Sequence, residues 1–193
     1  SKQVNPRVLV MVPTRELVVQ VVEEIAKFSK YMNIRVEGVY GGTNINRQKE
    51  ALAQGTDIIV ATPGRLYDLE ISRAVQLKAV KKLVIDEVDV MLDLGFRFQL
   101  NNIFELLPER RQNIMFSATM TDEIETLIQD FFRGTEKVSV AVSGTPLENI
   151  DQSCYSVPNF YTKINLLHHI LKDKEVFKKV LVLRLRRKTK KRM

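Results

Sequence analysis

The stretch from residue 7 to residue 28 reads RVLVMVPTRELVVQVVEEIAKF and holds the clearest structural pattern of the chain. Its first part, RVLVMV (7–12), is an almost unbroken run of β-prone apolar residues, typical of a strand covered on both faces in a parallel sheet. Thr14 then stands where a helix N-cap is expected, and Glu16 in the first turn favours the helix dipole. Apolar residues recur after it at three- and four-residue intervals: Leu17, Val18, Val21, Val22, Ile25 and Phe28. This stretch therefore predicts a central strand followed by an amphipathic helix.

The same alternation continues along the chain. We predict further strands near 35–40 and at 57–61, 82–86, 113–117 and 137–142. We predict helices near 45–54, from Pro63 onward, near 97–107 and near 121–132. Strands that alternate with helices in this way predict an α/β fold built on an open parallel sheet.

The composition changes at residues 143–151 (SGTPLENID), where glycine, proline and polar residues occur without periodicity, as in a linker. We therefore place one domain at 1–142. Residues 152–183 predict a strand (QSCYSV), a helix (FYTKINLLHHILKD) and a second strand (KKVLVL). Because this is too little to bury a core, we interpret it as the beginning of a second domain. A basic tail, 184–193, follows.

The net charge of +7 lies in that tail, RLRRKTKKRM, which contains seven basic residues and no acid. The remaining residues carry equal numbers of basic and acidic side chains, so the charge says nothing about the partner of the globular part. We interpret the tail as solvated and disordered.

The chain has neither an 18-residue apolar run nor a basic leader followed by an apolar segment. We therefore expect a cytoplasmic protein with no membrane partner. Cys154 is the only cysteine, which excludes an internal disulfide. We expect it to be a small buried side chain in a strand. His168 and His169 are adjacent on a helix and cannot readily bind one metal together, so we interpret them as structural.

Ligands of open parallel sheets bind at the carboxyl ends of the strands, so polar residues directly after buried runs are the first candidates for a site. In VIDEVD (84–89) an apolar run leads into Asp86, Glu87 and Asp89. An acid at this place can hold hydrated Mg²⁺ beside nucleotide phosphates, and a neighbouring glutamate can orient the attacking water. An aspartate that caps the next helix, beside a solvated glutamate, explains the residues equally well.

Three other turns follow predicted strands, and each has two interpretations. Ser117 and Thr119 in FSAT could hydrogen-bond a neighbouring carboxylate, or one of them could simply cap a helix. PTRE (13–16) and ATPGR (61–65) each place an arginine and free helix amides at the rim of the sheet, which suits phosphate oxygens but also an ordinary helix start. Gly41 and Gly42 permit close approach of a ligand or merely a turn.

Taken together, these segments resemble the motifs of DEAD-box ATP-dependent RNA helicases. The order and approximate spacing of that family are kept by PTRELVVQ (13–20), GG (41–42), TPGRL (62–66), VIDEVDVMLDLGF (84–96) and SAT (117–119). The resemblance implies a RecA-like open parallel sheet with helices on both faces, followed by a truncated start of a second RecA-like domain. It also implies hydrolysis of ATP coupled to remodelling of RNA duplexes, which makes the parent protein an enzyme.

The resemblance further implies a role for each matching residue. Asp86 and Glu87 would be the pair that serves ATP and Mg²⁺, largely through water, and Asp89 would contact Ser117 and Thr119 to link the nucleotide state to the RNA state. Other matching positions would line the path of the RNA sugar–phosphate backbone: Pro13, Thr14, Arg15, Gly41, Gly42, Thr62, Pro63, Gly64 and Arg65. Such contacts carry little sequence preference. We expect the protein to act as a monomer on RNA.

Three departures from the family pattern limit this reading. Val88 stands where the family normally has alanine, and its extra methyl groups could crowd the side that faces the second domain, although we expect the fold to accept them. None of the glycines is followed by lysine, so these 193 residues contain no GxxxxGK[ST] phosphate loop. The basic tail does not continue the pattern of the second domain. We therefore read the chain as a fragment and expect it to be a poor ATPase by itself.

Two other functions remain open. The missing phosphate loop favours a non-catalytic RNA- or protein-binding module, whereas the presence of both Asp86 and Glu87 argues against one. The third hypothesis is a DNA-directed helicase or translocase. The PTREL and TPGR segments favour the RNA helicase over it.

Overall fold

A computed structural model describes residues 5–139 and 150–183 of the chain. The chain divides into two compact units, Ser1–Gly144 and Thr145–Met193. This division falls inside the segment that the sequence predicts as a linker. The tail at 184–193, which we interpreted as disordered, lies outside the described residues.

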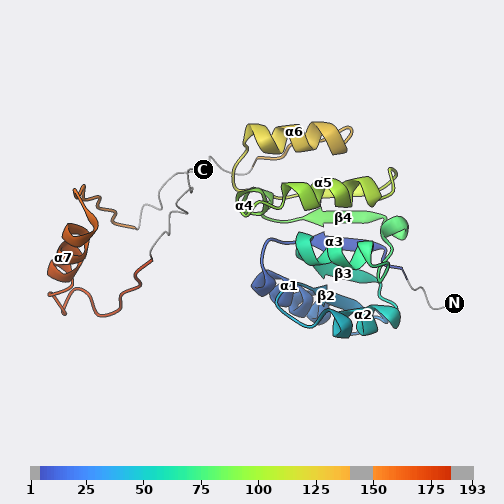
Figure 1. Ribbon diagram of the computed structural model, residues 1–193, viewed down its shortest axis with the longest axis horizontal. Coiled ribbons are helices and arrows are strands. Elements are labelled where there is room, and N and C mark those ends of the chain that lie inside the picture. The colour runs from blue at the N-terminus through green and yellow to red at the C-terminus, as the bar shows by residue number, and fades with distance from the viewer. Residues whose placement is uncertain (1–4, 140–149, 184–193) are drawn as a thin grey trace, which may run out of the picture. The chain divides into compact units, whose positions relative to one another are not determined.

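The first unit is built on a five-stranded sheet whose neighbouring strands are all parallel, in the order β2-β3-β1-β4-β5. The strands labelled in Figure 1, β2, β3 and β4, follow one another in this order. The strands are β1 (Val8–Met11), β2 (Val36–Val39), β3 (Ile58–Ala61), β4 (Lys82–Ile85) and β5 (Gln112–Met115). The predicted α/β fold with an open parallel sheet is therefore confirmed. Because β1 lies in the middle, the turns that follow β3, β1 and β4 are brought together at one rim.

Helices connect these strands, most of them close to where the sequence places them; no helix was predicted over residues 77–79 or 88–93. They are α1 (Arg15–Phe28), α2 (Ile45–Ala53), α3 (Pro63–Ile71), the short 3₁₀ turn η1 (Leu77–Ala79), α4 (Val88–Asp93), α5 (Arg97–Leu106) and α6 (Asp122–Phe131). Several begin at side-chain caps: the Leu17 N–H donates to Thr14 Oγ1 at 3.3 Å, and the Ile124 N–H donates to Thr121 Oγ1 at 3.4 Å. Such caps satisfy amide groups that a helix start leaves unpaired.

The two faces of the sheet bury different sets of side chains. On one face, alternate residues such as Leu9, Ile59 and Leu83 pack with α2 to α6 into the main core, where they are fully buried. On the other face, Val10 and Val60 pack with α1. Period-two alternation of apolar residues on both sides explains why these strands read as continuous apolar runs.

Helix α1 approaches β2 closely because position 38 is a glycine. A Cβ atom built on Gly38 would lie 3.0 Å from Val18 Cγ1 and 3.2 Å from Val22 Cγ2. Real Cβ atoms rarely make contacts this short, so a larger residue at position 38 would push α1 away from the strand.

The second unit contains one regular element among its described residues, α7 (Phe160–Ile170). The predicted helix is thus present, but the strands predicted at QSCYSV (152–157) and KKVLVL (178–183) are not. A strand needs a neighbouring strand to satisfy its backbone, and these runs have no paired partner among the described residues. Cys154 is exposed rather than buried.

Two further predictions have mixed outcomes. The strand predicted at 137–142 is not formed over residues 137–139, and its remainder lies outside the described residues. His168 and His169 both lie in the last turn of α7 and are exposed. That place near the negative end of the helix dipole suits cationic side chains.

Candidate functional site

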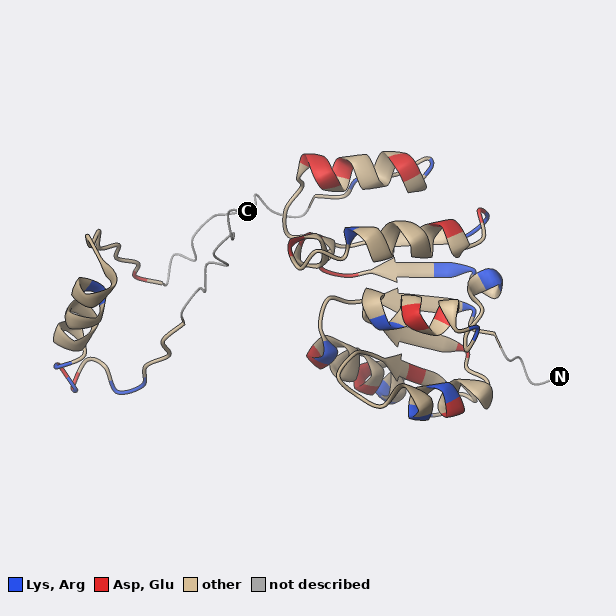
Figure 2. Cartoon of the chain, in the orientation of Figure 1, with Lys and Arg blue, Asp and Glu red and all other residues tan. Residues whose placement is uncertain are grey.

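The acidic turn after β4 and the hydroxyl-bearing turn after β5 lie at the same rim of the sheet. The Asp86 N–H donates to the Met11 carbonyl at 3.0 Å, which continues the β1–β4 ladder. The Phe116 N–H donates to the Ile85 carbonyl at 2.8 Å, and the Val88 N–H donates back to the Phe116 carbonyl at 3.2 Å. These bonds bring the two motifs together, as a shared site requires. In Figure 2 the acidic segment that follows the β4 arrow is red.

Glu87 occupies an unusual backbone conformation at this rim. Its φ is 52° and its ψ is 50°, which is the left-handed region, and it directly precedes α4. Its N–H donates to Asp86 Oδ1 at 3.0 Å, and its side chain is exposed. A non-glycine residue held in this region costs of order 1 kcal/mol, and such residues concentrate at functional sites. The strain is consistent with a functional turn, although Arg73 has a similar φ of 56° elsewhere in the unit.

Val88 follows the strained residue and turns into the core. Its side chain is fully buried in the main cluster beneath the sheet. The extra methyl groups relative to alanine are therefore accommodated by this unit's own core. This burial agrees with the expectation that the fold accepts valine at this position.

Asp89 is the residue that joins the two turns. Its Oδ2 accepts from both the Thr119 N–H and the Thr119 Oγ1, each at 3.1 Å. Burial by itself raises the pKa of Asp89, but the hydrogen bonds from the Thr119 hydroxyl and from the Val90 and Thr119 amides outweigh it and lower the pKa overall. Asp89 is therefore ionised at neutral pH and remains a pure acceptor.

Ser117 has a different partner from the one that the family resemblance implies. Its Oγ donates to the Thr119 carbonyl at 2.7 Å, so it braces the turn that presents Thr119. Of the two hydroxyls that flank Ala118, only that of Thr119 forms a described hydrogen bond with Asp89.

The PTRE turn follows β1 and leads into α1. Thr14 caps the helix, and the exposed Arg15 places its guanidinium carbon 5.2 Å from the centre of the Tyr40 ring. This distance is within the range of a cation–π contact. Pro13 is buried, so its side chain supports the turn rather than facing a ligand.

The Gly41–Gly42 turn follows β2 and is exposed. Gly42 has a φ of 79°, and a Cβ atom at either glycine would meet no heavy atom within 4 Å. The conformation at position 42 requires glycine, whereas the space above both residues is open to an approaching ligand.

The TPGR turn opens α3. Thr62 and Pro63 are buried, and the Thr62 N–H donates to the Val39 carbonyl at 3.0 Å, which ties the turn to β2. Gly64 is half-buried, with room for a Cβ atom 3.6 Å from Phe96. The guanidinium of Arg65 donates to Gln48 Oε1 at 3.0 Å and to the Thr43 carbonyl at 3.1 Å.

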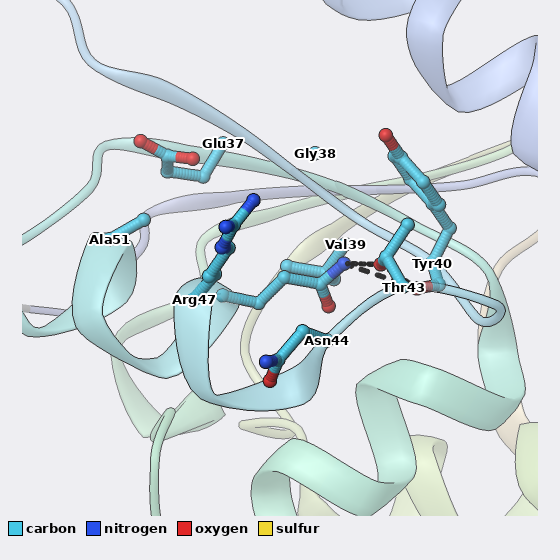
Figure 3. Close-up of a pocket in the computed structure, with 9 residues that line it drawn as sticks. Glu37, Gly38, Val39, Tyr40, Thr43, Asn44, Arg47 and Ala51 are labelled. Atoms are coloured by element: carbon cyan, nitrogen blue, oxygen red, sulfur yellow. Dashed lines mark hydrogen bonds between the residues drawn. The ribbon is translucent and has the colours of Figure 1, made fainter.

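Tyr40 and Gln48 are site residues that the sequence reasoning missed. Gln48 lies on α2 and contacts the Tyr40 carbonyl, Thr43 and Arg65. Figure 3 shows the bonds to Tyr40 and Thr43 as dashed lines, beside a hollow of about 410 Å³ lined also by Glu37 and Arg47. Burial raises the pKa of Glu37 at the edge of this hollow.

The described residues fit a loosely held magnesium ion better than a fully coordinated one. Across residues 5–139 and 150–183, no group of three or more His, Cys, Asp or Glu side chains could hold a metal ion. Asp86 uses Oδ1 for the Glu87 amide. Mg²⁺ keeps several waters and takes one or two carboxylates together with substrate phosphates, so Asp86 with Glu87 beside it is an adequate protein contribution.

The comparisons with known proteins identify the family of this chain. The model of the family described as DEAD/DEAH box helicase matches residues 1–127. The chain therefore belongs to the DEAD/DEAH box helicase family.

Curated relatives are similar over most of this chain but are much longer. The DEAD-box ATP-dependent RNA helicase CshA of Streptococcus pneumoniae is 40% identical over 152 residues, which cover 79% of this chain and 29% of that protein. The DEAD-box ATP-dependent RNA helicase 52A of Oryza sativa is 44% identical over 152 residues, covering 77% of this chain and 25% of that protein. The chain thus spans less than a third of the length of these relatives.

Solved structures show the same fold. A hypothetical ATP-dependent RNA helicase from Sulfolobus tokodaii is 37% identical with a TM-score of 0.65, over 67% of this chain and 39% of that one. The yeast DEAD-box splicing factor Prp28 is 38% identical with a TM-score of 0.64, over 68% of this chain and 32% of that one. These neighbours support the RecA-like assignment. In the described part of the chain, no helix is both long and apolar enough to cross a membrane.

Proposed function

We propose that this chain forms the acid-bearing and part of the RNA-binding surface of an ATP-dependent RNA helicase. The observation that carries the proposal is the pair of hydrogen bonds from Thr119 to Asp89, which joins the DEVD and SAT turns at the rim where Asp86 and Glu87 lie. Relatives with up to 44% identity are named ATP-dependent RNA helicases, which supports the same activity here.

The acidic turn supplies the chemistry of this activity. Asp86 and Glu87 hold hydrated Mg²⁺ in the proposed complex, and the ion would neutralise charge on the phosphates of ATP. Glu87, exposed at the strained turn, accepts a hydrogen bond from the attacking water and orients it. Asp89 stays ionised and keeps Thr119 in place, so movement of one turn is transmitted to the other.

The other half of the rim supplies the RNA surface. Arg15, the Gly41–Gly42 turn and the start of α3 present cations and backbone amides at this rim. Contacts of this kind go to phosphate and sugar, so binding should depend on salt and little on sequence. The buried Pro13, Thr62 and Pro63 would shape this surface from below.

A graft into a longer relative tests the proposed enzyme. Residues 5–139 would replace the matching segment of CshA, and ATP hydrolysis would be measured with and without single-stranded RNA. We expect RNA-stimulated hydrolysis, and the Glu87→Gln change should reduce it by about two orders of magnitude or more, because a positioned carboxylate contributes on that scale. Glu105→Gln, at an exposed position on α5, is the matched control and should leave the rate unchanged.

A non-catalytic RNA-binding module is the second candidate. It is favoured by the hydrogen-bonded arginine network. A graft that binds RNA but hydrolyses no ATP, or whose hydrolysis is indifferent to Glu87→Gln, would favour the module over the enzyme.

A further inference from the structure

The side-chain amide of Gln48 forms hydrogen bonds through both its nitrogen and its oxygen, all within the small region around Tyr40, Thr43 and Arg65. Its Nε2 donates to the Tyr40 carbonyl at 3.1 Å and to Thr43 Oγ1 at 2.8 Å, and its Oε1 accepts from Arg65 at 3.0 Å. The Tyr40 carbonyl can only accept and the guanidinium can only donate, so a flipped amide would lose these bonds. The orientation of Gln48 is therefore fixed by its partners.

Arg65 is held at a second point as well. It donates to the Thr43 carbonyl at 3.1 Å, while the Thr43 hydroxyl lies 3.3 Å from the Tyr40 carbonyl. Gln48 and Arg65 thus hold both ends of the turn from Tyr40 to Thr43, which contains both glycines, and we call this arrangement the bracket. Hydrogen bonds from a charged donor are stronger than those between neutral groups, so this bracket is a substantial constraint.

Tyr40 extends the bracket to the start of α1. Its carbonyl is bound by Gln48, and its ring lies under the guanidinium of Arg15. The PTRE turn, the glycine turn and the TPGR turn are consequently linked through Tyr40 and Gln48, two residues that lie in none of the three motifs.

The linkage matters because a glycine pair is conformationally free. Gly41 and Gly42 have no side chains to hold them, and fixing them costs more entropy than fixing other residues. Gln48 is carried by α2, which is anchored in the core by the buried Leu52. Helix α2 therefore restricts, through Gln48, the conformation of a turn whose two glycines have no side chains to restrict it.

We propose that Gln48 is a positioning residue for RNA, which holds Arg65 and the Tyr40–Thr43 turn in the arrangement that receives the sugar–phosphate backbone. This inference rests on the proposed function, because it concerns the RNA surface assigned there. Gln48 acts through its neighbours and need not contact RNA itself.

Nuclear magnetic resonance of the full 193-residue chain tests the role. Four proteins would be compared with wild type: Gln48→Met, Arg65→Met, the double variant, and Asn46→Met as a matched amide-to-methionine control at an exposed position of α2. Each would be titrated with a ten-nucleotide oligouridine. The amide resonances of Gly41, Gly42 and Gly64 report binding at this surface separately from any binding by the basic tail.

If Gln48 acts through Arg65 and the turn, Gln48→Met should weaken binding at these amides by roughly tenfold, in the middle of the range for network couplings. The double variant should be no weaker than Arg65→Met alone, because the two losses are not independent. The Arg65 side-chain nitrogen resonances should show restricted rotation of the guanidinium in wild type and Asn46→Met, and faster rotation in Gln48→Met.

The two ways of failing are distinguishable. Wild-type binding at these amides, together with unchanged affinity and unchanged Arg65 resonances in Gln48→Met, overturns the role of Gln48 and leaves the proposed RNA surface intact. Additive losses in the double variant also overturn it, since they show that Gln48 does not act through Arg65. Absence of wild-type shifts at Gly41, Gly42 and Gly64 overturns both the RNA surface and the role built on it, even if the Arg65 resonances respond to Gln48→Met.

Discussion

In the half of the rim that follows β1, β2 and β3, side-chain hydrogen bonds hold the turns in place. In the half that follows β4 and β5, few such hydrogen bonds are formed. In the first half, Gln48, Arg65 and Thr43 form a closed set of hydrogen bonds with Tyr40. In the second half, Asp89 and Thr119 are joined, but the carboxylate of Asp86 accepts only from the neighbouring Glu87 amide among its described hydrogen bonds.

This difference suits the two proposed tasks. A surface for an extended phosphate backbone gains affinity when its cations and turns are held in place beforehand. A carboxylate pair that awaits a hydrated ion and a nucleotide needs free acceptor atoms instead. The structure therefore predicts that the arginine half is preformed in this chain, while the acidic half gains order only with its ligands.

Breaking the preformed half should have the largest effect on stability. Arg65→Met removes the hydrogen bonds to Gln48 and to the Thr43 carbonyl, and should lower the free energy of unfolding by about 2 kcal/mol, as expected for bonds made by a charged donor. Chemical denaturation of the two proteins measures the difference. A loss below about 0.5 kcal/mol, the lower end for one ordinary hydrogen bond, would contradict a preformed bracket.

Breaking the link in the acidic half should cost less and should depend on pH. Asp89→Asn keeps an acceptor for Thr119 but removes the charge, and should lower stability at pH 7 by about 0.5–1 kcal/mol, since the site is half-buried and near solvent. The folded-state pKa of Asp89 lies below its ordinary value of 3.8, so its contribution is present above that pH and is lost as the pH falls through the folded-state pKa.

The measurement for Asp89 is the stability difference between wild type and Asp89→Asn from pH 7 down to pH 2. The difference should be constant at neutral pH and should shrink below about pH 4, near the ordinary pKa of the group. A gap that widens on acidification would show that the sign of the linkage is wrong.

Relieving the strain at Glu87 should raise stability modestly. Glycine accepts the left-handed conformation at position 87 without penalty, although it also gains freedom in the unfolded chain. We expect Glu87→Gly to raise the free energy of unfolding by about 0.5 kcal/mol, because the two effects partly cancel. Glu87→Ala is the control that removes the same carboxylate without relieving the backbone. Equal stability of the two variants would show that the turn is not strained.

The smallest effect is expected at Glu37, beside the hollow near α2. Burial raises the pKa of its carboxyl above the ordinary value of 4.5, so the charged form opposes folding once the pH rises through the folded-state pKa. Glu37→Gln should therefore have a slightly higher melting temperature than wild type at pH 7, with the gap closing below pH 4.5. Glu50→Gln, at an exposed position on α2, should show no such gap.

The sequence was informative where local patterns and tertiary structure agree. Apolar runs placed the three inner strands, β3, β1 and β4, because strands covered on both faces are almost continuously apolar. The order of turns after those strands then brought the acids and hydroxyls to one rim. Asp89 and Thr119 meet as the family resemblance implies, but Ser117 turns to the Thr119 carbonyl, a choice made by the local turn geometry.

The sequence was uninformative where a residue's role depends on distant partners. Gln48 reads as an ordinary polar residue of an amphipathic helix, yet its partner Arg65 lies 17 positions away. The β-prone runs at 152–157 and 178–183 were predicted as strands from composition alone, and composition does not reveal whether a neighbour is available to pair.

Because Gly38 has no side chain, the edge strand β2 sets the position of helix α1. Since Val18 and Val22 rest directly above this residue, the spacing between β2 and α1 is fixed there, near the middle of the helix. Added bulk would push α1 away from β2 and carry Arg15, which begins that helix about one turn before Val18, off the Tyr40 ring. A substitution at position 38 would thus change the affinity of the rim for a polyanion, although no residue that contacts the polyanion is changed.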